Sequence, residues 1–101
     1  MRMLMTIRLP HETFNAAVRD GNAGKKTDAI LSEVKPEAVY FTEMKGRRTV
    51  LMIVDVASPA KVPALAEPWF LTFDADVEFH VVMNPQELKE AGLDALGRKW
   101  G

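Results

Sequence analysis

The chain has 101 residues, 48% of them hydrophobic and 27% charged, which is the balance of a folded globular domain rather than a disordered segment. Its length supports a single hydrophobic core, and its net charge of -1 gives no broad positive field for nucleic acid or an anionic membrane. No cysteine is present, so disulfides, thiolate metal sites and cysteine nucleophiles are excluded.

Residues 1–9 alternate between two kinds of side chain. Every odd position is methionine, isoleucine or leucine. The even positions are Arg2, Leu4, Thr6 and Arg8. This period of two predicts a β-strand, ended by Pro10, whose odd face packs against helices. Residues 1–9 also lack the features of a signal peptide, and no apolar run approaches the roughly 20 residues of a membrane span. We therefore expect a cytoplasmic protein without a membrane segment.

Residues 11–34 carry apolar side chains at helical spacing, in two groups. The first group surrounds Phe14, and the second surrounds Ile30. Between them lies Gly21–Gly24, and two glycines so close together disfavour a continuous helix. The dipeptide Lys35-Pro36 ends the second piece, because a residue before proline avoids the helical region.

Residues 39–44 and 49–56 are predicted to be the two strands of a hairpin, joined at Lys45–Arg48. The second strand is apolar without a break from Val50 to Val54. A strand with one face in water would alternate, so both faces of this one must be covered. In so short a chain its own helices cover one face, and a second copy of the chain is the simplest cover for the other. The sequence therefore predicts a homodimer formed through the open face of the sheet.

The remaining residues supply a helix, a strand and a helical tail. Ser58-Pro59 is a helix start, and Pro68 is expected to kink or end that helix. Its apolar face is predicted to be Val62, Leu65, Ala66, Trp69 and Phe70. Residues 76–83 alternate as a fourth strand. Asn84–Glu87 is a capping box that opens a C-terminal helix, with residues 88–101 as a helical tail.

The order strand, helix, strand, strand, helix, strand, with an extra C-terminal helix, is the ferredoxin-like β-α-β-β-α-β arrangement. This is an α+β fold in which an antiparallel sheet carries its helices on one face. We expect one such domain over residues 1–101.

Several segments resemble those of small uncharacterised bacterial proteins with single ferredoxin-like domains of the dimeric α+β-barrel type. The segments are Asn15-Ala16-Ala17 with Arg19-Asp20-Gly21, Lys35-Pro36-Glu37-Ala38 followed by Tyr40-Phe41, Ala66-Glu67-Pro68, and Val82-Met83-Asn84-Pro85. The resemblance extends to about Leu88 and implies two sheets packed face to face. It implies no particular activity, since the wider group contains cofactor-free monooxygenases, haem enzymes and proteins without a known reaction.

Strand alternation also predicts a candidate site. If the odd residues of the first strand face the helices, Arg8 faces the second sheet, together with Glu78, His80 and Tyr40. In a ferredoxin-like sheet the first and fourth strands are neighbours, so an arginine, a glutamate and a histidine meet between the two sheets. His80 would exchange a proton near neutral pH, with Glu78 orienting it and Arg8 holding an anionic substrate. The alternative is a structural ion pair between Arg8 and Glu78 at the barrel rim, with His80 filling space beside it.

Other chemistries have weaker support. The only histidines, His11 and His80, have no ligand-like neighbours at helical spacing, so no metal and no cofactor is expected. The segment Lys45–Arg48 lacks the aromatic residue that an RNA-recognition sheet needs, and we interpret it as a solvated hairpin tip. Three function classes remain. They are a structural dimer, a module that binds a small organic ligand between the sheets, and a cofactor-independent monooxygenase- or isomerase-like enzyme using His80 and Arg8.

Overall fold

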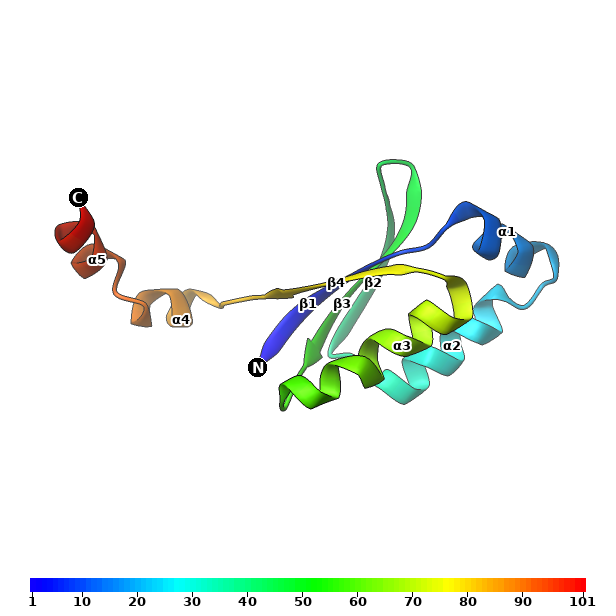
Figure 1. The fold of residues 1–101 in the computed structure, drawn as a ribbon, viewed down its shortest axis with the longest axis horizontal. Helices are drawn as coiled ribbons and strands as arrows, with labels where there is room; N and C mark the ends of the chain where they lie inside the picture. The colour runs from blue at the N-terminus through cyan, green and yellow to red at the C-terminus, as the bar shows by residue number, and fades with distance from the viewer.

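A four-stranded antiparallel sheet is the centre of the fold in the computed structural model, which describes residues 1–101 (Figure 1). The strands are β1 (Arg2–Arg8), β2 (Ala38–Met44), β3 (Arg47–Asp55) and β4 (Asp76–Val81). Their order across the sheet is β2-β3-β1-β4. The first and fourth strands are therefore neighbours, as the sequence predicted, and the α+β architecture is compatible with a ferredoxin-like arrangement.

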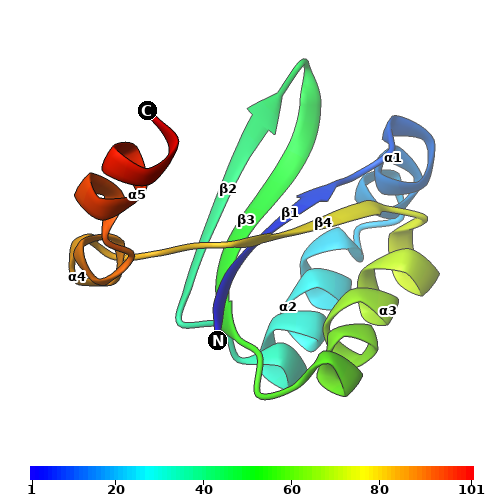
Figure 2. The same cartoon turned by 60° about the vertical axis from the view of Figure 1, so that its left-hand side comes forward.

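Three helices of at least two turns and one short 3-10 turn complete the body of the protein. They are α1 (His11–Arg19), α2 (Ala23–Val34), the turn η1 (Pro59–Lys61) and α3 (Val62–Phe73). Figure 2 shows α2 and α3 side by side on one face of the sheet. The predicted break between α1 and α2 is present, and Lys35 ends α2 in the left-handed region with φ 52°.

The main core lies between these helices and the sheet. Met5, Ile7, Val50 and Met52 are fully buried, and the register pairs Met5 with Met52 and Ile7 with Val50. Trp69 contributes the largest side chain from α3, with no exposed surface. The alternation in β1 thus does what the sequence predicted, because its odd residues reach the helices and its even residues do not.

The opposite face of the sheet, which we call the open face, has no helix on it (Figure 2). On the two central strands, β1 and β3, its apolar residues are Leu4, Leu51 and Ile53, and Leu4 lies directly opposite Ile53 in the register. All three are half-buried, and none belongs to the core packed against the helices. The unbroken apolar run in β3 therefore divides between the core and this uncovered face.

Two details of α3 differ from the expectation. The helix does not end at Pro68 but continues to Phe73, although an interior proline removes one backbone hydrogen bond and crowds the preceding turn. Phe70 was expected on the apolar face, yet it is exposed, and Phe73 takes that place against Trp69 with ring centroids 6.2 Å apart.

The C-terminal residues form two short helices rather than the single helix that we expected. The capping box at Asn84 and Glu87 is present, with both of its hydrogen bonds, and opens α4 (Pro85–Glu90). Gly92 then turns the chain with φ 72°, and α5 (Leu93–Trp100) follows. Every residue from 83 to 101, which we call the C-terminal arm, is exposed, and the arm extends away from the body (Figure 1).

The helices of the chain are all too short or too polar to cross a membrane.

Candidate functional site

Arg8, Glu78 and His80 come together on the open face and form what we call the polar cluster. In the register of β1 and β4, Thr6 lies opposite Glu78 and Leu4 lies opposite His80. The Arg8 guanidinium donates a hydrogen bond from Nη1 to Glu78 Oε1, reaching diagonally across the two strands. His80 Nε2 lies 3.3 Å from the second carboxylate oxygen, Oε2. One carboxylate thus joins the arginine to the imidazole.

Both partners stabilise the ionised form of Glu78. The hydrogen bond from Arg8 and the positive charge of Arg8 are the main causes, and together with a smaller contribution from His80 they hold the pKa of the Glu78 carboxyl below its usual range. Desolvation acts in the opposite direction and is outweighed. Glu78 is therefore an ionised hydrogen-bond acceptor at neutral pH rather than a proton donor.

The polar cluster lies on an open surface in the single chain. The exposed fractions of the Arg8, Glu78 and His80 side chains are 30%, 44% and 55%. None of the three hollows on the chain is lined by any of these residues. A site built on the polar cluster is consequently incomplete until something covers the open face.

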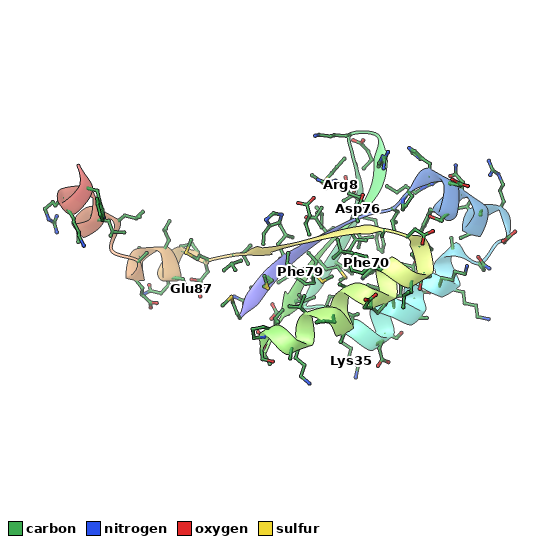
Figure 3. All side chains as sticks on the ribbon, in the orientation of Figure 1. Arg8, Lys35, Phe70, Asp76, Phe79 and Glu87 are labelled. Atoms are coloured by element: carbon green, nitrogen blue, oxygen red, sulfur yellow. The ribbon has the colours of Figure 1, made fainter.

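The cluster also carries no excess of positive charge. Glu78 balances Arg8, and Asp76 lies directly opposite Arg8 in the register. Figure 3 shows Arg8 and Asp76 at the same end of the sheet, far from Glu87 in the C-terminal arm. This arrangement disfavours the anionic substrate that Arg8 alone would suggest.

The structure does not bring Tyr40 to the polar cluster. Tyr40 lies on the open face, but its row across the sheet runs through Leu51 and Thr6 before it reaches Glu78. At about 4.8 Å per strand, Tyr40 and Glu78 are about 14 Å apart. The sequence predicted the face of Tyr40 correctly. It did not predict that Tyr40 lies on the edge strand β2, whereas Glu78 and His80 lie on the other edge strand, β4.

Arg48 does not belong to a solvated hairpin tip, which corrects the prediction from the sequence. It donates from Nη1 to Asn15 Oδ1 at 2.7 Å, and its guanidinium lies over the Phe14 ring, 4.9 Å from the centroid. A hollow of about 240 Å³ lies beside Arg48 and Phe14. The alternation of β3 contained the signal, since Arg48 is two residues from buried Val50 and therefore points to the helix side.

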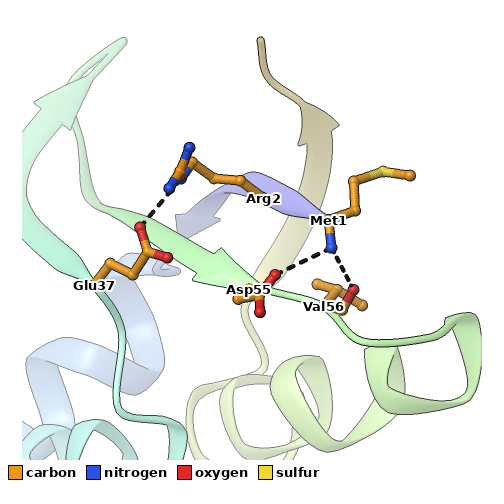
Figure 4. Close-up of polar contacts among 5 residues, drawn as sticks. All are labelled: Met1, Arg2, Glu37, Asp55 and Val56. Atoms are coloured by element: carbon orange, nitrogen blue, oxygen red, sulfur yellow. Dashed lines mark hydrogen bonds and ion pairs between the residues drawn. The ribbon is translucent and has the colours of Figure 1, made fainter. Parts of the chain in front are cut away.

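The far end of the sheet holds two further ion pairs (Figure 4). Arg2 Nε lies 3.2 Å from Glu37 Oε2, and the amino group of Met1 lies 3.0 Å from Asp55 Oδ1. Arg2 therefore pairs with Glu37 and is not part of the polar cluster. Nowhere in the chain do three His, Asp or Glu side chains come close enough to hold a metal ion.

Comparison with known proteins adds no assignment: no protein-family model matches the chain, and no curated protein matches it.

Proposed function

We propose that this protein is a homodimeric α+β barrel, made of two ferredoxin-like sheets packed face to face, that binds a small organic ligand between the sheets. The observation that carries the proposal is the open face. There, apolar Leu4, Leu51 and Ile53 adjoin the polar cluster without any cover from the chain itself. Stacked sheets lie about 10 Å apart, so a second sheet would enclose these side chains.

The ligand class follows from the charges and the neighbours of the polar cluster. Glu78 already engages Arg8, so the cluster offers hydrogen bonds without a spare positive charge. Beside it, Leu4 and His80 are direct cross-strand neighbours. Leu4 offers an apolar surface, and the His80 ring offers nitrogen atoms for hydrogen bonds. We infer an uncharged, mainly apolar ligand with one polar group that hydrogen-bonds to His80.

Tyr40 joins the site only through the second copy. A two-fold axis parallel to the strands sets the β2 edge of one sheet opposite the β4 edge of the other. In that arrangement Tyr40 of one copy faces the His80 side of the second copy. The dimer would then supply both edges of one ligand site, which explains why a single chain has no hollow at the polar cluster.

Sedimentation and NMR test this proposal. At micromolar concentration the chain should sediment as a dimer. Titration with phenol should shift the methyl signals of Leu4, Leu51 and Ile53 and the ring signals of His80. Benzoate has the same ring but a negative charge and should shift them far less. A monomer contradicts the dimer, and a dimer whose open-face signals respond to neither compound contradicts the ligand site and favours a structural dimer.

The contact between His80 and Glu78 favours one second candidate, a cofactor-independent isomerase-like enzyme. With Nε2 oriented by Glu78 at 3.3 Å, the other ring nitrogen is available to a ligand as a base. The reaction would move a proton from one carbon of an unsaturated ketone to another, with no net change in composition. Incorporation of solvent deuterium into 3-cyclohexenone, lost in His80→Gln, would support it, and no incorporation above the buffer rate would refute it.

A further inference from the structure

The C-terminal arm is helical, but every one of its residues is exposed. Its two helices have 6 and 8 residues, whereas isolated helices below about 12 residues are marginal in water. The apolar residues of the arm are nonetheless exposed. They are Met83, Leu88, Leu93, Leu96 and Trp100. Such an arm needs a surface to pack against, and it extends away from the sheet and helices of its own chain (Figure 1).

The apolar residues of α5 form one face. Leu93, Leu96 and Trp100 follow the spacing i, i+3, i+7, which places them along one side of the helix. Trp100 is 78% exposed, and the Lys99 ammonium lies over its ring, 5.3 Å from the centroid. Tryptophan carries the largest apolar area of any side chain and dominates protein interfaces. This face has the composition of an interface rather than of a solvated surface.

The size of the chain's surface agrees with this interpretation. Its accessible area is 7039 Å², about 1,300 Å² above the roughly 5,700 Å² of a folded monomer of 11.3 kDa. Its radius of gyration is 16.9 Å, against about 13 Å for a compact domain of this length. A standard interface buries about 800 Å² on each partner, so the excess surface exceeds one partner's share of a standard interface.

The position of the arm indicates which molecule covers it. In Figure 2 the arm lies on the side of the sheet opposite α2 and α3, beyond the open face. A second copy packed on the open face would occupy this side, within reach of the arm. A two-fold axis makes the exchange reciprocal, which closes the assembly as a dimer instead of a fibre.

We propose that the C-terminal arm is exchanged between two copies, so that the apolar face of α5, with Trp100 as its anchor, packs on the body of the second copy. This inference rests on the proposed dimer. It adds a second interface to the sheet-to-sheet contact, because residues 83–101 of each copy also pack on the other copy.

The chain supplies an internal control for the test, because its two tryptophans have opposite predicted behaviour. In dimers mixed from ¹³C-labelled and unlabelled copies, the Trp100 indole protons should show intermolecular NOEs to methyl groups. The Trp69 indole, fully buried in its own core, should show none. Deletion of residues 93–101 should raise the dimer dissociation constant by roughly tenfold or more, as loss of an interfacial tryptophan does. Lys99→Ala, which keeps Trp100, should leave the constant unchanged.

The outcomes separate the arm from the dimer. A dimer whose Trp100 shows no intermolecular NOE, and whose dissociation constant is unchanged by the deletion, overturns the exchanged arm and leaves the face-to-face dimer intact. A full-length chain that is monomeric at micromolar concentration overturns both. Intermolecular NOEs from Trp100 together with weakened dimerisation after the deletion support the exchange.

Discussion

Arg8 and Glu78 form an ion pair across β1 and β4 although they are 70 residues apart in the chain. The pair is diagonal, since Arg8 lies directly opposite Asp76 in the register and Glu78 lies opposite Thr6. By reaching past Asp76, Arg8 engages the carboxylate that also contacts His80. Arg8 thereby sets the charge state of the one group that orients the histidine.

The first prediction concerns the Glu78 carboxyl. Arg8→Gln should raise the pKa of Glu78 toward its usual range, because the hydrogen bond and the charge of Arg8 are its main causes of depression. Arg8→Lys should raise it less, since lysine keeps the charge and loses the planar guanidinium. NMR titration of the Glu78 side-chain carboxyl carbon measures the three values. An unchanged Glu78 pKa in Arg8→Gln would show that the pair does not form in solution.

The second prediction is the pH dependence that follows. A carboxyl whose pKa is lower in the folded than in the unfolded protein stabilises the fold above the unfolded value, about 4.3 for glutamate. This contribution is lost as pH falls through the lowered, folded value. The stability advantage of the wild type over Glu78→Gln should therefore shrink on acidification below about pH 4.3. Urea denaturation of both proteins at several pH values measures it, and an advantage that grows toward low pH would contradict the sign.

Much of the architecture was predictable because it depends on local patterns. The alternation in β1 and β4 placed Arg8, Glu78 and His80 on one face, and the capping box at Asn84 marked the start of α4. Alternation gives the face of a side chain but not its position along the sheet. For that reason the sequence grouped Tyr40 with residues about 14 Å away.

The errors came from interactions between distant segments. The sequence near Arg48 indicates a solvated charge, because its partners Asn15 and Phe14 belong to α1, more than 30 residues away in the chain. Pro68 looked like a helix end because helix propensity disfavours proline, yet Ala66 before it and Trp69 and Phe73 after it are buried, and this packing keeps α3 helical through Pro68. The separation of the C-terminal arm from the body had no sequence signal, since amphipathic helices look alike wherever their apolar faces pack.

The third prediction compares two neighbours in β3 that point to opposite faces. Ile53→Asp places a charge on the open face and should weaken dimerisation while the domain stays folded. Met52→Asp places a charge in a position with no exposed surface and should unfold the domain. Sedimentation and circular dichroism distinguish the two effects. A dimer of unchanged stability in Ile53→Asp would refute the open-face interface.

The fourth prediction concerns the hairpin between β2 and β3. Lys45 and Gly46 both have positive φ, 55° and 77°, as a two-residue hairpin turn requires. Gly46→Ala should cost about 1–2 kcal/mol, because alanine is strained in the left-handed region. Gly24→Ala is the matched control. Its φ is not positive and its surroundings are open, so helical alanine should be neutral or stabilising by up to about 1 kcal/mol. Equal effects of the two substitutions on urea denaturation would contradict this assignment of the turn.

The last prediction concerns Trp69, whose Nε1 is buried without a hydrogen-bond partner. Trp69→Ala should cost about 3–5 kcal/mol through lost burial and a cavity. Trp69→Phe keeps an aromatic ring against Phe73 and removes the unpaired donor, whose burial itself costs about 1–3 kcal/mol. The phenylalanine variant should therefore lose no more than about half as much free energy of unfolding as the alanine variant. Urea denaturation of the two variants measures both costs. If phenylalanine is as damaging as alanine, the indole nitrogen has a partner in solution and the core around α3 is arranged differently.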